Sequence, residues 1–152
     1  ICDGGAVMPP VFGACLEMLK SINCDLKDKQ VFIIANSDIF GKTLAKVLEC
    51  RGAKAETVKA TDKNLNKKIM KADILIAAVG KPKFIKKEMI KKDAVIIDIG
   101  ITKKGKKVFG DVDFEDVKDR AGYITPVPGG VGPLTIAMAF RNTVEIWGRR
   151  KK

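Results

Sequence analysis

Three short, almost uninterrupted apolar runs constrain the fold of this 152-residue chain more than any other feature. They lie at residues 31–35 (VFIIA), 73–79 (DILIAAV) and 94–99 (AVIIDI). Apolar runs of this length without alternation are typical of strands that are buried on both faces of a parallel sheet. Two less apolar runs, at residues 53–58 and 123–127, are predicted to be further strands, the first of them near an edge.

Segments with helical periodicity alternate with these runs along the chain. They are predicted at residues 11–22, 41–50, 65–71, 86–91, 114–120 and 133–147, with Gly52 ending the second and Asp113 capping the fifth. The lysine-rich residues 103–107 are predicted to form a surface turn. The alternation predicts an α/β fold, a Rossmann-like doubly wound, mostly parallel sheet with helices on both faces. We expect residues 1–152 to form one such domain.

The charge of the chain is strongly basic, with 29 Lys and Arg against 18 Asp and Glu and a formal net charge of +11. The lysines are spread along the chain in pairs, and one Trp and one Tyr do not make an aromatic stacking platform. We therefore expect a lysine-rich solvated surface, and nucleic-acid binding is the weaker alternative. The sequence has no run of eighteen apolar residues, so no membrane span is expected.

The cysteine pattern does not indicate a metal site. The four cysteines lack C-x-x-C spacing and the chain contains no His. Cys15 and Cys50 fall on the apolar faces of predicted helices and are expected in the core. The N-terminus lacks a signal-peptide pattern, and we expect a cytoplasmic protein. It also lacks Met, so we expect a fragment of a longer protein.

The most unusual stretch is residues 124–138, which read ITPVPGGVGPLTIAM. Its prolines fix φ and remove N–H donors, and its glycines, Gly129, Gly130 and Gly132, can take φ > 0 close to a flat ligand. Pro133 suits the first turn of the helix that follows. The stretch predicts a rigid loop that runs into a helix N-terminus, which favours an anionic or polar ligand group. A Pro/Gly-rich turn without a ligand is the alternative, and both interpretations stay open.

This stretch closely resembles the C-terminal signature of the bifunctional methylenetetrahydrofolate dehydrogenase/cyclohydrolase family. Segments at residues 77–85 (AAVGKPKFI), 94–102 (AVIIDIGIT) and 110–114 (GDVDF) resemble the family in the same order. The resemblance covers about residues 13–143 and implies the NAD(P)-binding half of that fold. The family's N-terminal catalytic domain is expected to be absent from this chain.

The first strand is followed by a turn that resembles the family's Gly-x-Ser-x-x-x-Gly, with Ala35 in place of the first glycine. Ser37 keeps a hydroxyl that can cap the helix or donate to a phosphate. Gly41 lets the helix pack closely on the sheet. The Ala35 methyl lies where the backbone would approach the cofactor, so the resemblance implies weak dinucleotide binding.

Two positions that decide between NADP and NAD depart from the family. Asn36 stands where many members have Arg, and Lys59-Ala60-Thr61-Asp62 stands where many read His-Ser-x-Thr. Lys59 and Lys63 could hold a 2′-phosphate. Alternatively, Asp62 could accept from a ribose 2′-hydroxyl, which would favour NAD. We expect NADP, with NAD as the alternative.

The resemblance and the strand-end positions together give a set of predicted site residues. The predicted cofactor-binding residues are Ala35, Asn36, Ser37, Gly41, Lys59, Ala60, Val79, Gly80, Pro82, Gly100, Ile101 and Thr135. The predicted substrate-binding residues are Pro128, Gly129, Gly130, Val131, Gly132 and Pro133. Asp98 is expected to bond nearby backbone rather than to act in catalysis.

The resemblance implies a protein that oxidises methylene-tetrahydrofolate with NAD(P), and that in full length hydrolyses the methenyl product to formyl-tetrahydrofolate. The family's catalytic lysine lies in a Tyr-x-x-x-Lys motif, which Tyr123 does not provide. No catalytic residue is therefore predicted in this chain, and folate is expected to bind through the missing N-terminal domain. A homodimer is expected. The alternative is a non-catalytic Rossmann-like interaction module derived from the family.

Overall fold

The computed structural model describes residues 7–149, and its centre is a five-stranded sheet in the order β2-β1-β3-β4-β7. Every neighbouring pair in this sheet is parallel. The strands are β1 (Gln30–Ala35), β2 (Lys54–Val58), β3 (Ile74–Ala78), β4 (Val95–Asp98) and β7 (Tyr123–Ile124). All five predicted strands are confirmed, and the more polar β2 lies at an edge as predicted.

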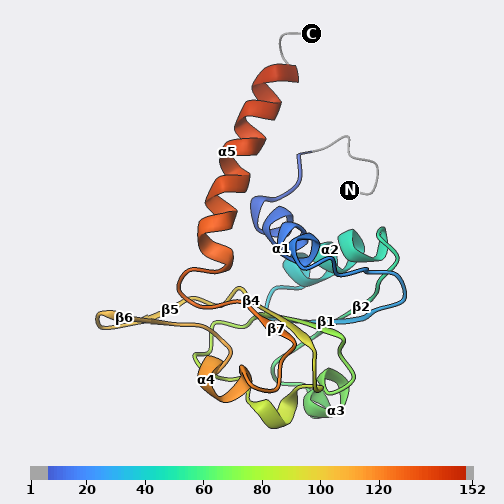
Figure 1. Ribbon diagram of the computed structural model, residues 1–152, viewed down its shortest axis with the longest axis vertical. Helices are drawn as coiled ribbons and strands as arrows, with labels where there is room; N and C mark the ends of the chain where they lie inside the picture. The colour runs from blue at the N-terminus through green and yellow to red at the C-terminus, as the bar shows by residue number, and fades with distance from the viewer. Residues whose placement is uncertain (1–6, 150–152) are drawn as a thin grey trace.

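Helices cover both faces of the sheet, which confirms the doubly wound α/β fold. They are α1 (Pro10–Ser21), α2 (Asp38–Glu49), α3 (Leu65–Ile69), the 3₁₀ turn η1 (Lys87–Met89), α4 (Phe114–Val117) and α5 (Val131–Arg149). Figure 1 shows α1 and α2 on one side of the sheet and α3 and α4 on the other. Helix α5 packs against α1 and extends beyond the sheet. No helix in residues 7–149 is long and apolar enough to span a membrane.

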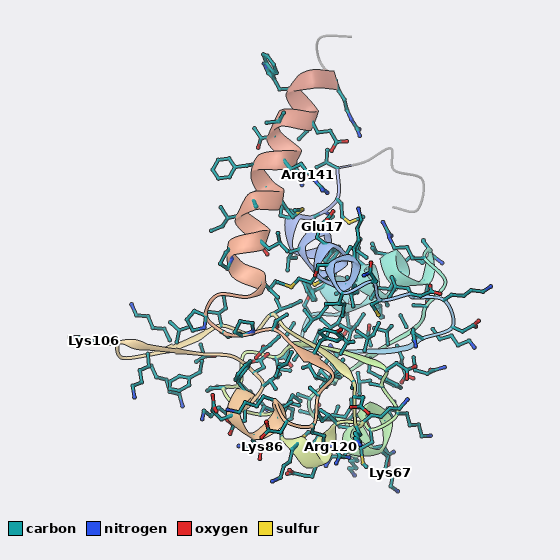
Figure 2. All side chains as sticks on the ribbon, in the orientation of Figure 1. Glu17, Lys67, Lys86, Lys106, Arg120 and Arg141 are labelled. Carbon is teal, nitrogen blue, oxygen red and sulfur yellow. The ribbon has the colours of Figure 1, made fainter. Side chains whose placement is uncertain are left out.

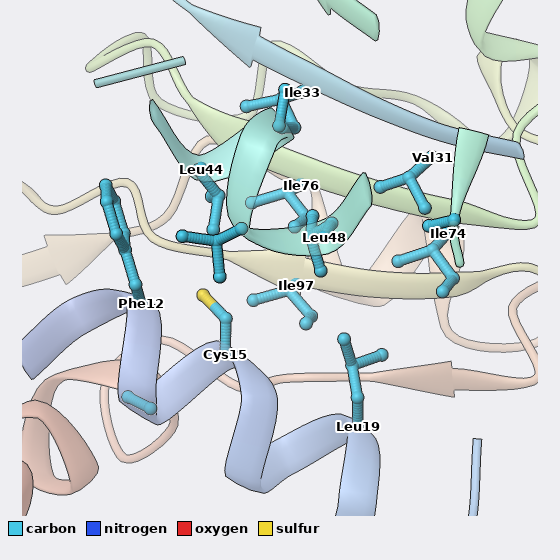
Figure 3. Close-up of a cluster of buried hydrophobic side chains, with 14 of the residues drawn as sticks. Phe12, Cys15, Leu19, Val31, Ile33, Leu44, Leu48, Ile74, Ile76 and Ile97 are labelled. Atoms are coloured by element: carbon cyan, nitrogen blue, oxygen red, sulfur yellow. The ribbon is translucent and has the colours of Figure 1, made fainter. Parts of the chain in front are cut away.

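The core has two halves because successive side chains of a strand point to opposite faces. Val31 and Ile33 of β1 pack in the cluster beneath α1 and α2, which Figure 3 shows with Leu44 and Leu48 of α2. Phe32 and Ile34 pack in the other cluster, with residues of α3, η1 and α4. Both halves need apolar side chains, and this explains why the strands read as apolar runs without alternation.

The segment predicted as a surface turn is a β-hairpin. Strands β5 (Thr102–Lys104) and β6 (Lys107–Phe109) are antiparallel and join at Gly105, whose φ is +60°. The hairpin extends away from the body of the molecule (Figure 1). Its strands are three residues long and half of their residues are lysine, so they lack the apolar alternation that marks a strand in sequence.

Two smaller predictions are wrong. Cys50 follows α2 and is exposed, although Cys15 is fully buried as predicted. Asp113 stands at the start of α4, but its side chain makes no capping hydrogen bond. The Asp113 carboxylate instead pairs with Lys83 at 3.2 Å and with Lys86 at 2.7 Å. The side chain cannot serve both purposes, and the two ammonium groups hold its pKa below the usual value.

Candidate functional site

The strand order reverses between β1 and β3, where β1 is followed by a connection to the edge strand β2 and β3 by a connection to β4. In open α/β sheets, ligands bind in the crevice outside the carboxyl ends of the strands at such a point. The loops that leave β1 and β3 meet there, since Asn36 Nδ2 donates to the Val79 carbonyl oxygen at 2.7 Å. The predicted residues Asn36 and Val79 are therefore brought together by the fold.

The N-terminus of α2 lies at this switch point, directly after β1. Ser37 is its N-cap and accepts a hydrogen bond from the Phe40 N–H at 3.3 Å. The cap explains why α2 begins at Asp38, three residues earlier than the sequence predicted. Lys59 Nζ lies beside this end of the helix, where it donates to the Asn36 carbonyl oxygen at 2.7 Å and pairs with Asp38. Hydrogen bonding to Lys59 lowers the pKa of Asp38.

Gly41 lets α2 lie close to the sheet, as predicted. A Cβ at this position would come within 2.4 Å of Thr57 Cγ2 on β2. Ala35, at the end of β1, is buried and is in register with Ala78 of β3. The contact at Gly41 sets how closely α2 packs on the sheet.

The loop after β3 is organised by Asp111, which was not among the predicted site residues. Asp111 is fully buried, and its carboxylate accepts from Val79 N–H at 2.5 Å, Gly80 N–H at 3.0 Å and Lys81 N–H at 2.8 Å. The N–H groups of the predicted residues Val79 and Gly80 are thus already bonded within the protein. These residues, with the half-buried Pro82, can shape the crevice but offer no amide donors to a ligand.

Asp98, at the end of β4, bonds nearby backbone as predicted. Its carboxylate accepts from Gly100 N–H at 2.9 Å, Asp111 N–H at 3.0 Å and Val112 N–H at 2.8 Å. Burial raises the pKa of Asp98 to about 6 despite these donors, and the neighbouring Asp111 adds to the rise. The Asp98 carboxylate is therefore ionised at neutral pH and titrates only in mild acid.

The Pro/Gly loop forms a second hollow of about 140 Å³ next to the end of β4. It is lined by Asp98, Ile99, Ile101, Val108, Pro126, Val127, Pro128, Gly129, Gly130, Val131, Gly132 and Pro133. All six predicted substrate-binding residues line it, and so does Ile101, which is 63% exposed. Sequence reasoning missed Val108, which comes from the unpredicted hairpin. The Val127–Pro128 peptide bond is cis.

One of the three glycines of this loop has the predicted positive φ, and the other two do not. Gly129 has φ = +104° and nothing within 4 Å of the position a Cβ would take. In the described residues Gly130 and Gly132 do not have positive φ, so that prediction is wrong for both. At Gly130 the need is space, because a Cβ would lie 2.4 Å from the Pro126 carbonyl oxygen. A Cβ at Gly132 would meet only Ile101 Cδ1, at 3.9 Å, so Gly129 and Gly132 both have space around them.

Three further predicted residues have ordinary structural partners. Thr135 Oγ1 donates to the Val131 carbonyl oxygen within α5 at 2.8 Å. Ala60 is half-buried against the core cluster below the sheet. Asp62 uses both carboxylate oxygens, one for the Asn64 N–H at 2.8 Å and one for Lys68 at 3.1 Å. No group of three or more His, Cys, Asp or Glu within residues 7–149 could hold a metal ion.

A parallel sheet with a switch point between β1 and β3, a helix N-terminus at that point and a Pro/Gly-lined hollow at the carboxyl end of β4 is typical of dinucleotide-binding domains of the doubly wound class. The comparison with protein families agrees. Residues 9–151 match the family described as tetrahydrofolate dehydrogenase/cyclohydrolase, NAD(P)-binding domain, and the chain belongs to that family.

Named relatives support the same assignment. The chain is 45% identical over 139 residues to the bifunctional protein FolD of Mycoplasma capricolum, which covers 90% of this chain and 49% of the relative. A FolD structure from Campylobacter jejuni superposes with a TM-score of 0.92 at 36% identity, over 97% of this chain and 52% of that one. A Trypanosoma brucei FolD structure, complexed with NADP and an inhibitor, superposes with a TM-score of 0.91 at 30% identity, over 100% of this chain and 55% of that one. The chain therefore spans about half the length of these relatives.

Proposed function

We propose that this chain is the cofactor-binding half of an NADP-dependent methylenetetrahydrofolate dehydrogenase whose full-length form is also a cyclohydrolase. The supporting observation is the continuity of the site. The switch-point crevice at Asn36 and the hollow under the Pro/Gly loop lie along the same edge of the sheet. A dinucleotide is an extended molecule with a charged centre and a flat reactive ring, and such an edge suits it.

In the proposed reaction, methylene-tetrahydrofolate loses a hydride and becomes methenyl-tetrahydrofolate, and NADP accepts that hydride and becomes NADPH. The cofactor supplies the redox chemistry. The protein positions the two molecules. The N-terminus of α2 with Ser37 favours the phosphates. Ile101 and the loop around Gly129 form the apolar wall against which the two flat rings meet and from which water is excluded.

The preference for NADP over NAD rests on the environment of Lys59. Its side chain is 45% exposed beside Asn36, whereas both oxygens of Asp62 are already bonded. Lys59→Gln is expected to weaken NADP binding roughly tenfold, the effect of losing one charged hydrogen bond, and to leave NAD binding nearly unchanged. Calorimetry on the purified chain measures both, with Lys71→Gln as the matched control, since Lys71 is exposed and lies before β3, at the other edge of the sheet.

The outcomes of this titration separate the candidate functions. An equal loss for NADP and NAD in Lys59→Gln would contradict the NADP preference. Absence of binding of either dinucleotide to the wild-type chain at millimolar concentration would favour the alternative, a non-catalytic interaction module. The substitutions at Ala35 and Asn36 motivate that alternative, since each replaces a residue that contacts the cofactor in the family's pattern.

We infer that the catalytic residues of the cyclohydrolase step lie outside this chain. Tyr123 is on the edge strand β7 and is 55% exposed, and Val127, not a lysine, stands four residues later. Proton transfer in that step needs a positioned acid or base. The purified chain is expected to hydrolyse methenyl-tetrahydrofolate at the buffer rate, as followed by its absorbance. Hydrolysis above that rate would overturn the inference.

The second half of the proposed enzyme has a candidate docking surface on α5. One face of this helix packs on α1 through the buried Met138 and through Asn142, whose Nδ2 donates to the Met8 carbonyl oxygen at 2.7 Å. Figure 2 shows Arg141 on α5 above Glu17 on α1, and the two pair at 3.1 Å. Another face carries exposed apolar side chains at helical spacing, namely Ile136, Phe140, Val144 and Trp147.

We propose that these exposed side chains pack against the folate-binding half, because the chain spans about half the length of its relatives. Phe140→Ser is expected to leave the thermal midpoint of this chain unchanged, since Phe140 is 70% exposed here. In the full-length protein it is expected to lower both the midpoint and the dehydrogenase rate. An unchanged midpoint in both would contradict this packing.

A homodimer in the cytoplasm completes the proposal, as the family resemblance implies. Sedimentation of the full-length protein tests the dimer. A monomer at micromolar concentration would contradict it.

A further inference from the structure

Two buried carboxylates lie where the loops of the site converge. Asp98 is 3% exposed at the end of β4, and Asp111 is 0% exposed just after β6. None of the ion pairs found within residues 7–149 includes either of them. A buried charge without a cation is costly unless hydrogen bonds replace its hydration. The partners of these two side chains therefore indicate their purpose.

Those partners are all backbone N–H groups, and they connect three loops in series. Asp111 holds the loop after β3 through Val79, Gly80 and Lys81. The N–H of Asp111 donates to Asp98, which also accepts from Gly100 in the loop after β4. The series therefore runs from the β3 loop through Asp111 and Asp98 to Gly100.

The Pro/Gly loop joins the same series. The N–H of Asp98 donates to Thr125 Oγ1 at 2.8 Å, and Thr125 directly precedes Pro126 at the start of that loop. The hollow beneath the loop is lined by Asp98 itself. The loop after β3, the loop after β4 and the start of the Pro/Gly loop thus meet at the two carboxylates.

Glycines leave room for the carboxylates and for nothing larger. A Cβ on Gly100 would lie 2.1 Å from Asp111 Cγ, and a Cβ on Gly110 would lie 2.0 Å from Asp98 Oδ2. The same Gly110 atom would also lie 2.9 Å from Val127 Cγ2 of the Pro/Gly loop. The backbone packs closely around the two side chains, so neither carboxylate can shift without displacing a loop.

The chemistry requires carboxylates because six N–H groups point at them. An ionised carboxylate accepts with both oxygens, whereas an amide of the same shape would turn an NH₂ group toward an N–H donor. An asparagine at either position keeps the shape and loses one oxygen acceptor. Asparagine variants therefore test the hydrogen-bond series with little change in side-chain volume.

We propose that Asp98 and Asp111 are positioning residues, which fix the loops at residues 79–81, 100–101 and 125–130 as the wall for the nicotinamide end of the cofactor. This rests on the proposed function, since it assumes a dinucleotide along the carboxyl edge of the sheet. The adenosine end, beside Ser37 and Lys59, makes no direct hydrogen bond to either carboxylate among the described residues. Its one link to them is indirect and runs from Asp111 through Val79 to Asn36. The two ends of the cofactor should therefore respond differently to the loss of either carboxylate.

Calorimetry of the chain with NADP and with adenosine 2′,5′-bisphosphate, which lacks the nicotinamide half, separates the two ends. Asp98→Asn is expected to weaken NADP binding roughly tenfold and to leave the bisphosphate unchanged. Asp111→Asn is expected to weaken NADP more than the bisphosphate, whose site it reaches only through Val79 and Asn36. Asp113→Asn is the matched control, since it removes a carboxylate two residues from Asp111 whose partners are the side chains of Lys83 and Lys86. The control is expected to change neither affinity.

Thr125→Val provides a second variant, which removes only the acceptor of the Asp98 N–H and keeps the side-chain shape. It is expected to show the same selective loss of NADP affinity at smaller size, even if an asparagine variant does not fold. Equal losses for NADP and the bisphosphate, or unaltered NADP affinity in every folded variant, would overturn the positioning role. If the wild-type chain binds neither compound, the proposed function fails and this inference fails with it.

Discussion

Close packing at single glycines sets the geometry of the site at the residue scale. Gly41 brings α2 against Thr57 of β2, and no larger residue fits there without displacement. Gly41→Ala is expected to destabilise the protein by roughly 1–3 kcal/mol, the usual effect of overpacking a core. Denaturant unfolding measures the change.

Two matched variants identify the cause of that loss. Gly148→Ala adds a methyl where nothing lies within 4 Å, and in a helix it is expected to be neutral or slightly stabilising. Thr57→Ser removes the Cγ2 atom that an alanine at position 41 would meet, so the double variant should recover much of the lost stability. Without recovery in Gly41→Ala/Thr57→Ser, the contact with Cγ2 is not the cause.

The titration of Asp98 has a second consequence at this scale. Burial raises its pKa to about 6 in the folded protein, against about 3.9 in an unfolded chain. The folded state therefore binds a proton more tightly, so the contribution of Asp98 to stability is greatest below about pH 4 and is lost as pH rises through about 6. The full change is about 3 kcal/mol.

Subtracting the unfolding free energy of Asp98→Asn isolates this effect, because asparagine does not titrate. Between pH 4.5 and 7.5 wild-type protein is expected to lose stability relative to the variant. Carboxylates with lowered pKa, such as Asp113 beside Lys86, act at lower pH with the opposite sign and cancel in the difference. A constant difference across that range would show that Asp98 has an ordinary pKa in the folded state.

Individual residues differ in how far the sequence predicts them. Ser37 and Gly41 were predictable because a helix N-cap and a close helix–strand contact depend on neighbouring positions. Asp111 was not, because its partners Val79 to Lys81 lie about thirty residues away and the sequence does not show that they meet. Polar residues that are buried by distant loops lack a local sequence signal.

At the scale of elements, two variants of the Pro/Gly loop distinguish its effect on stability from its effect on cofactor binding. Gly130→Ala places a methyl against the Pro126 carbonyl oxygen and is expected to lower the thermal midpoint strongly. Gly129→Ala meets no atom but strains a residue with φ = +104°, at about 1 kcal/mol or more. Its methyl also enters open space next to the hollow, so NADP affinity is expected to fall.

Both quantities must be measured on the same sample of each variant. Thermal unfolding gives the midpoint and calorimetry gives the NADP dissociation constant. An unaltered dissociation constant in Gly129→Ala, together with a lower midpoint, would show that this loop is only a turn.

The elements that the sequence predicted share one property. Strands β1, β3 and β4 are buried on both faces, and a continuous apolar run records this directly. The β5–β6 hairpin has no continuous apolar run, because its lysines face solvent and its pairing depends on the turn at Gly105. Sequence periodicity thus predicts strands that are buried, and it does not predict strands whose side chains are mostly exposed.

At the scale of the whole molecule, the crevice exists only in the folded sheet, so a bound cofactor must stabilise the entire fold. NADP at about 100 times its dissociation constant is expected to add about 2.7 kcal/mol to the free energy of unfolding. For a domain of this size that raises the thermal midpoint by roughly 5–10 °C. Scanning calorimetry over a series of NADP concentrations tests this, and a midpoint independent of NADP would contradict binding to the native state.

The sequence predicted the class of this architecture but not the order of its strands. Alternating helices and apolar strands indicate a parallel sheet in any α/β protein. The order β2-β1-β3-β4-β7 depends on which strands pair across long connections, and no local pattern in the sequence indicates this. The switch point between β1 and β3, where we propose that the cofactor binds, was therefore not predicted from the sequence.

The bond between Asn36 and Val79 joins residues that are 43 positions apart. A growing polypeptide completes β1 long before β3 is made, and the amides of the loop after β3 gain their acceptor only when Asp111 has been added. The two sides of the crevice therefore come together late in synthesis, after most of the sheet has been translated. A cofactor that needs both loops therefore cannot bind during the early steps of folding. It can stabilise only chains in which these loops have already come together.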